Sequence, residues 1–224
     1  MSAALDLTPP ADDDPDALAL SALLSSRVCH DLINPVGAVG SGLEVLEDPS
    51  MEGSMREAAM DLIQSGAKKA IALLSYARLA YGAAGGFGAQ ISLEDARKAL
   101  EGVYETHKAD LEWGLGADLA AKENVKVLLI LAYAAADCVP RGGKVSLTGD
   151  INNFIITATG KKVLLNDSLV RALGGDASDI APKFTPALIA ARMIGGAGGV
   201  MSADLTDDVV TFRARFAGTV ERDS

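Results

Sequence analysis

A histidine at residue 30 lies in the only stretch of the chain whose residue types point to a specific chemistry. Residues 26 to 35 read SRVCHDLINP, so that His30 is followed by the acidic Asp31 and, four positions on, by Asn34. An imidazole near neutral pH can move protons or act as a nucleophile. A lone histidine is also often an ordinary core or surface residue. The predicted secondary structure around His30 is therefore needed to distinguish a reactive histidine from an ordinary one.

The region around His30 is predicted to be one long helix, because apolar residues recur every three or four positions from residue 18 to residue 46. On a helical projection they fall within roughly 160° around Val28, wide enough for the buried face of a bundle helix. His30 lies about 200° from Val28 and is expected to point outward. The apolar positions are Leu20, Leu24, Val28, Leu32, Val36, Val39, Leu43 and Leu46. The outward face is expected to hold Arg27, Asn34, Gly37, Ser41 and Glu44.

A proline within this helix argues against an uninvolved surface histidine. Pro35 stands five residues after His30, and a proline inside a helix removes one backbone hydrogen bond at a cost of about 3 kcal/mol. Strong amphipathic patterns on both sides of it predict a kinked but continuous helix. We therefore expect the proline to serve a site close to His30.

The run from His30 to Pro35 resembles the H-box of the dimerisation and phosphotransfer domain of histidine kinases. The resemblance implies that His30 carries a phosphoryl group on Nε2, that Asp31 orients the ring and that Asn34 faces an incoming receiver domain. It implies a receiver-binding face on the same helix. The residues expected there are Arg27, Pro35, Gly37, Gly40, Ser41 and Glu44.

A second helix is predicted from about residue 54 to residue 81, after the Asp48-Pro49-Ser50 turn. Two such helices form an antiparallel hairpin, and one hairpin cannot bury its apolar stripe from all sides. Pairing with a second copy would give a four-helix bundle, so we expect a homodimer. The expected boundaries are a disordered acidic leader at residues 1–17, the hairpin at 18–83 and a glycine-rich linker at 84–90.

Residues 91–217 are predicted to form an α/β sandwich, which gives an α+β chain overall. Their order of elements resembles the ATP-binding domain of histidine kinases, but the nucleotide motifs are missing. Ile130 and Ala134 occupy the positions of Mg²⁺-binding asparagines, and Ala158 occupies that of the adenine-binding aspartate. Apolar side chains cannot coordinate a hard cation. The glycines of residues 195–199 follow a predicted helix and precede a strand, so we interpret them as a helix C-cap and not a phosphate loop.

Composition excludes several classes of partner and site. A formal net charge of −10 disfavours nucleic acid and anionic membranes as partners. The longest apolar run, residues 127–136, is too short to span a bilayer, which needs about 20 residues. Cys29 and Cys138 have no metal-ligand spacing, so we expect reduced thiols in a cytoplasm, and His107 is interpreted as a surface residue.

A chain that keeps the histidine but lacks the ATP motifs resembles the ChpT-type histidine phosphotransferases over residues 18–217. The resemblance implies a dimer that relays phosphoryl groups from the receiver domain of a hybrid histidine kinase to response regulators. It implies no cofactor on this chain, the Mg²⁺ belonging to the receiver. Two alternatives stay open: an ATP-dependent kinase with an unusual nucleotide site, and a non-catalytic dimeric pseudokinase that binds and regulates receivers.

Overall fold

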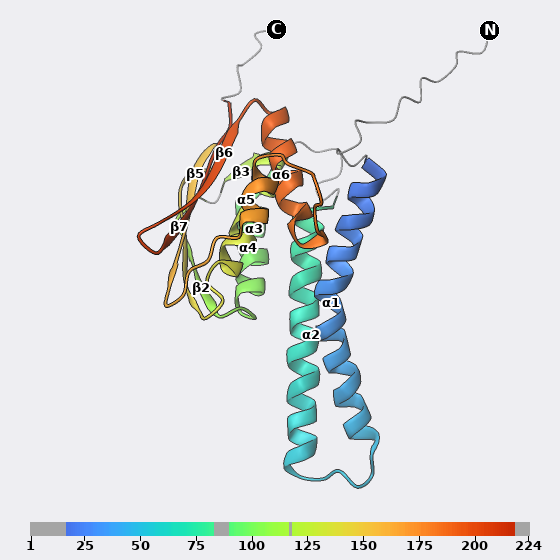
Figure 1. Cartoon of the computed structure of the whole chain (residues 1–224). Coiled ribbons are helices and arrows are strands. Elements are labelled where there is room, and N and C mark those ends of the chain that lie inside the picture. Colours follow the sequence, from blue (N-terminus) through green and yellow to red (C-terminus); the bar gives the residue numbers. More distant parts are fainter. Residues whose placement is uncertain (1–16, 83–89, 117, 218–224) are drawn as a thin grey trace, which may run out of the picture.

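The first part of the chain is a helical hairpin, as the sequence predicts (Figure 1). The computed structural model describes residues 17–82, 90–116 and 118–217. Helix α1 spans Ala17–Glu47 and helix α2 spans Ser54–Ala80. In the turn, the Asp48 carboxylate accepts hydrogen bonds from the backbone N–H and the hydroxyl of Ser50, at 2.8 and 2.7 Å. The predicted leader and linker lie outside the described residues, apart from Ala17 and Gln90.

Glycines allow the two helices to approach closely at two points along the hairpin. A Cβ atom added to Gly66 would lie 2.6 Å from the backbone oxygen of Pro35, and one added to Gly42 would lie 2.6 Å from Cγ1 of Ile63. Both distances are far below an ordinary van der Waals contact. Pro35 is buried in this contact while α1 continues through it, so it lies deeper than the outward face on which it was predicted, at the border of a groove beside Asn34.

The buried side of α1 is also rotated from the predicted stripe. Arg27, Pro35 and Gly42 are its buried residues, whereas the stripe members Val36 and Leu43 are 55% and 47% exposed. The difference arises because the single helix α2 covers only one side of the stripe. The uncovered apolar side chains form what we call the open strip, which a helical projection places on one side of the hairpin. Its members are Ile33, Val36, Leu43, Met60, Ile71 and Leu74.

The second part of the chain is the predicted α/β sandwich, a five-stranded sheet with helices on one face (Figure 1). The strand order is β2-β4-β5-β7-β6, with β2 and β4 parallel and the other neighbours antiparallel. The strands are β2 Ala109–Trp113, β4 Gly143–Asp150, β5 Asn153–Gly160, β6 Val200–Thr206 and β7 Val209–Arg215. The helices are α3 Leu93–Tyr104, α4 Lys122–Asp137, α5 Asp167–Leu173 and α6 Thr185–Gly196.

Three short elements complete the second part and were not predicted. β1 Gln90–Ser92 pairs antiparallel with β3 Leu119–Ala121, and the 3₁₀ helix η1 Pro182–Phe184 precedes α6. The glycines of residues 195–199 end α6, which confirms the C-cap prediction. The N–H of Gly199 donates to the Ile194 oxygen at 2.8 Å, and Gly198 adopts a φ of +67°. This bonding satisfies carbonyl groups that a helix end leaves free.

The main core lies between the sheet and its helices, and the end of α2 belongs to it. Strand β5 alternates buried and exposed residues, so one face of the sheet packs inward against α4. Eleven residues of α4 are buried, because the helix is covered by the sheet and by neighbouring helices. Tyr76, Leu79 and Ala80 of α2 join the same cluster. The hairpin is therefore anchored to the second part through the last turns of α2.

Across the described ranges, no helix combines the length and the apolar character that crossing a membrane requires.

Candidate functional site

His30 lies midway along α1 with its imidazole open to solvent. Its side chain is 77% exposed, as expected for the face opposite the predicted stripe. Nδ1 of the ring lies 3.5 Å from Oδ1 of Asp31, the next residue. That separation is at the outer limit of a hydrogen bond. When Nδ1 carries the proton and donates toward Asp31, Nε2 holds the lone pair and is the nucleophilic nitrogen.

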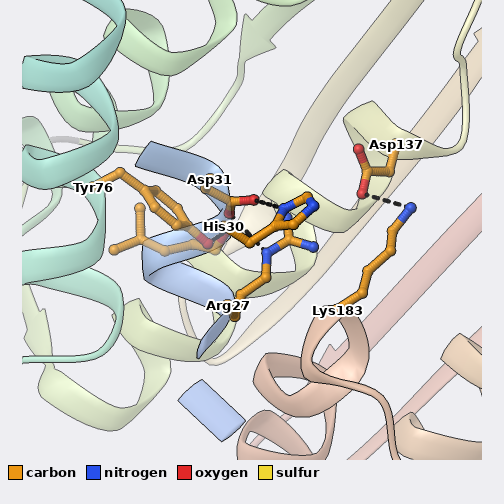
Figure 2. Close-up of polar contacts among 7 residues, drawn as sticks. Arg27, His30, Asp31, Tyr76, Asp137 and Lys183 are labelled. Atoms are coloured by element: carbon orange, nitrogen blue, oxygen red, sulfur yellow. Dashed lines mark hydrogen bonds and ion pairs between the residues drawn. The ribbon is translucent and has the colours of Figure 1, made fainter. Parts of the chain in front are cut away.

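Asp31 is held by a second partner, Arg27, one helical turn earlier. Nε of Arg27 donates to Oδ2 of Asp31 at 2.7 Å, so the two carboxylate oxygens face different groups. Figure 2 shows this pair directly beside the imidazole. The pair sits at the edge of the protein, because the Asp31 side chain is 21% exposed. Its carboxylate is thus fixed on one side by a short charge-assisted bond and open to His30 on the other.

Arg27 itself is buried, with 8% of its surface exposed, so its predicted place on the outer receiver-binding face is wrong. The physical reason is that the second part of the chain covers it: its guanidinium carbon lies 5.7 Å from the ring centre of Tyr133 in α4. Burial disfavours the charged guanidinium, but the pKa of Arg27 is raised overall, with Asp31 as the largest favourable influence. The cation is stabilised by its neighbours.

Three tyrosines join the end of α2 to α4 behind Arg27. Tyr76 stacks on Tyr133 with ring centres 4.9 Å apart and meets Tyr81 edge to face at 5.7 Å. The Tyr76 hydroxyl donates to the backbone oxygen of Leu129 at 3.2 Å. Burial raises the pKa of Tyr81 to about 12 and raises the pKa of Tyr133 as well. The rings therefore remain neutral at physiological pH and act as a rigid wall.

This wall borders a cavity of about 420 Å³ between the hairpin and the second part of the chain. Ile130 and Ala134, the positions aligned with metal-binding asparagines, line it together with Asp137. Oδ2 of Asp137 lies 3.5 Å from Nζ of Lys183 across the cavity (Figure 2). Burial raises the pKa of the neighbouring Cys138 thiol to about 12, so this side chain is a protonated thiol near neutral pH. Ala158 is buried in the sheet.

In the described part of the chain, no cluster of three or more histidine, cysteine, aspartate or glutamate side chains could hold a metal ion.

The remaining predicted receiver-facing residues do lie on the exposed surface of α1. Asn34, Gly37, Gly40, Ser41 and Glu44 are all exposed. A Cβ atom on Gly37 or Gly40 would meet nothing within 4 Å, so the backbone there is accessible from outside. Asn34 also borders an open groove of about 410 Å³ between α1, α2 and the end of α3.

The sequence did not identify the residues that α4 and η1 contribute, namely Tyr133, Asp137 and Lys183. One signal was present: the chain has four tyrosines, and three of them meet behind Arg27. His107 is half-buried, contrary to the prediction of a surface residue. Its Nδ1 lies 3.0 Å from the Val103 oxygen, and its ring packs edge-on against Tyr133.

The second part of the chain defines the class of protein. Residues 93–209 match the family described as histidine phosphotransferase C-terminal domain, and they follow directly on the hairpin that presents the exposed imidazole. The chain belongs to the histidine phosphotransferase family.

Two relatives narrow the class to the ChpT type, to which this phosphotransferase belongs. Protein phosphotransferase ChpT of Brucella abortus (strain 2308) is 38% identical over 180 residues, which cover 75% of this chain and 84% of that protein. A solved bacterial phosphotransferase superposes with a TM-score of 0.79 at 34% identity, covering 90% of this chain and 98% of the other.

Proposed function

We propose that the protein acts as a cytoplasmic relay in which His30 accepts a phosphoryl group from the receiver domain of a hybrid histidine kinase and passes it to response regulators. The observation that carries this proposal is the exposed imidazole whose Nδ1 faces a fixed carboxylate. An exposed ring is accessible to a large protein substrate, and the carboxylate favours the tautomer with a free Nε2. His30 and Asp31 are the residues that act on the reacting atoms.

In the proposed transfer, the Nε2 lone pair of His30 forms a bond to phosphorus while the bond between phosphorus and the receiver's aspartate oxygen breaks. The aspartate leaves as a carboxylate, and the proton stays on Nδ1. The phosphorylated ring gains positive character, which the Asp31 carboxylate stabilises. The reverse steps transfer the group to a second receiver. Catalysis by positioning and charge compensation suits phosphoryl transfer, and the Mg²⁺ is supplied by the receiver domain.

Receivers are proposed to dock on the exposed surface of α1 below His30. Asn34 faces the incoming domain, and Gly37, Gly40 and Ser41 allow a partner helix to approach the backbone, because open space lies above both glycines. Glu44 marks the far end of this surface. The accessible backbone supports the proposal.

We further propose that the chain draws no phosphoryl group from ATP and needs no cofactor of its own. The apolar side chains of Ile130 and Ala134 line the cavity where a nucleotide's metal would need oxygen ligands. Among the described residues, Asp137 is the one carboxylate that lines it, and Asp137 is paired with Lys183.

The decisive experiment follows radioactive phosphate from a panel of phosphorylated receiver domains to the purified full-length chain. We expect an acid-labile label on the wild type, no label on His30→Ala, and no label when ATP is the donor. A folded His30→Ala variant that still became labelled would contradict the assignment. If that variant bound receivers and functioned normally in cells, the alternative of a non-catalytic regulator would hold. Labelling by ATP alone would instead identify a kinase.

A further inference from the structure

The ion pair of Arg27 and Asp31 is less exposed than other pairs of the same spacing, and its arginine also contacts the second part of the chain. Arg97 and Glu101 of α3 also pair at four residues' distance, with Nε to Oε1 at 2.8 Å, but both side chains are nearly half exposed. Exposed pairs of this kind contribute little to stability. Burying a guanidinium incurs a desolvation cost that an exposed pair avoids. The burial of Arg27 therefore needs a reason beyond pairing.

The surroundings of Arg27 supply that reason. Its Nε holds Oδ2 of Asp31, the carboxylate whose other oxygen faces Nδ1 of His30. Its guanidinium carbon lies over the ring of Tyr133, which comes from α4 in the second part of the chain. Tyr133 is in turn fixed by stacking on Tyr76. Contacts thus run without interruption from α4 to the imidazole.

We propose that Arg27 is a positioning residue for phosphoryl transfer, and that Tyr133 keeps it in place, so that the second part of the chain helps to orient His30. This inference rests on the proposed function of His30 as phosphoryl carrier. Arg27 fixes the Asp31 carboxylate with one oxygen toward Nδ1, which favours the tautomer with a nucleophilic Nε2. Arg27 touches neither the imidazole's reacting nitrogen nor the phosphoryl group, and acts through Asp31.

Charge compensation is the second part of this role. The charged and titratable groups that surround the Arg27–Asp31 pair are Tyr76 and Tyr81 on and after α2, and Tyr133 and Asp137 on α4. His107 packs against Tyr133, and Lys183 pairs with Asp137. Arg27 balances the nearest carboxylate, Asp31. Without the guanidinium, the uncompensated Asp31 would favour a protonated ring, which has no free lone pair. The rate of phosphoryl acceptance would then fall at a higher pH than in the wild type.

The test uses phosphoramidate as a small donor, so that receiver docking does not enter. Nε2 of His30 forms the bond to phosphorus, the phosphorus–nitrogen bond of the donor breaks, and ammonia leaves. The measurement is the initial rate of His30 phosphorylation on the full chain between pH 5.5 and 8.5, together with thermal melting of each variant. The variants are Arg27→Met, Arg27→Lys, Tyr133→Leu and Tyr133→Phe, with Arg97→Met as the control for losing a pair of the same spacing.

We expect Arg27→Met to react about tenfold more slowly at pH 7, because a misplaced catalytic group costs one to two orders of magnitude. The acid limb of its rate profile should move to higher pH. Arg27→Lys should keep the profile and lose part of the rate, since it retains the charge without the planar fork. Tyr133→Leu should slow the reaction, Tyr133→Phe should restore it, and Arg97→Met should match the wild type.

Rates and pH profiles of Arg27→Met and Tyr133→Leu that match Arg97→Met would overturn the inference. If Arg27→Met does not fold, the comparison of Tyr133→Leu with Tyr133→Phe decides, since the latter retains the ring over the guanidinium. Failure of the proposed function looks different, because the wild type would then not be phosphorylated on His30 by receivers at all. A normal wild type with insensitive Arg27 and Tyr133 variants rejects the positioning role alone.

Discussion

At the scale of single residues, the imidazole of His30 faces solvent, whereas the side chains next to it are held by contacts within the protein. His30 is open to a protein partner, whereas Asp31 is fixed by a buried arginine and an aromatic wall. An accessible nucleophile beside a fixed orienting group suits a reaction whose other reactants arrive on a second protein. In the proposed relay, the chain supplies the orientation and the partner supplies the phosphoryl group.

The two cysteines should differ in reactivity, which tests the burial of the cavity wall. In a Cys29→Ser variant only Cys138 remains, and burial raises the pKa of its thiol to about 12. Because alkylation needs the thiolate, we expect no reaction with iodoacetamide at pH 8 in the native protein and one label per chain after unfolding in guanidinium. Mass spectrometry measures both states. Rapid labelling of the native variant would show that the wall of the cavity opens to solvent.

The sequence identified His30, Asp31 and Asn34 correctly as neighbours on one helix, because helical spacing alone places them. It placed Arg27 on the solvent-exposed side of α1, because a helical projection identifies only one buried face. In the structure, the second part of the chain covers a further face of the helix. Tyr133 lies a hundred residues from the histidine, and no local pattern connects the two. The contacts that position the site are long-range, which is why they could not be predicted.

At the scale of elements, the hairpin depends on backbone contact at Gly66. Its α1 and α2 were predicted within a few residues of their ends, since long periodic segments give a strong signal. No such signal marks the short strands β1 and β3, which have three residues each, or the 3₁₀ helix η1. The apolar pattern also could not predict which face of α1 packs on α2. Part of the apolar stripe packs on α2, and the rest belongs to the open strip.

Gly66→Ala should destabilise the protein. The added Cβ would lie 2.6 Å from the Pro35 backbone oxygen, and a backbone atom cannot move aside cheaply. We expect a loss of about 1–3 kcal/mol in the free energy of unfolding, measured by denaturant titration, as for other overpacked sites. Gly37→Ala is the matched control: nothing lies within 4 Å of its Cβ, and alanine should gain up to about 1 kcal/mol through helix propensity. Equal effects of both changes would contradict the close approach.

At the scale of the whole molecule, the open strip leaves apolar side chains of both hairpin helices without a partner among the described residues. Ile33 and Ile71 are 67% and 65% exposed. A second hairpin placed against this strip would complete a four-helix bundle about a two-fold axis, which is the homodimer that the sequence predicts. The dimer remains a proposal, supported by the strip, and it leaves His30 on a different face of α1.

Ile33→Glu should separate such a dimer, because each interface would bury two uncompensated carboxylates. We expect the mass of two chains for the wild type and of one chain for the variant, measured by light scattering after gel filtration. Val200→Glu is the control, since Val200 is 59% exposed on the edge strand β6, away from the hairpin. A wild type with the mass of one chain, or an unchanged Ile33→Glu, would reject the strip as the dimer interface.

The burial of Tyr76, Leu79 and Ala80 among the residues of the second part has a consequence for modularity. The last turns of α2 belong to the cores of both parts, so the predicted linker at residues 84–90 does not separate two interchangeable pieces. A hairpin taken from a relative and joined to this α/β part would bring three foreign side chains into its core. If receivers dock on the exposed face of α1 as proposed, exchange of partner specificity between relatives should be easier through substitutions on that face than through exchange of whole domains.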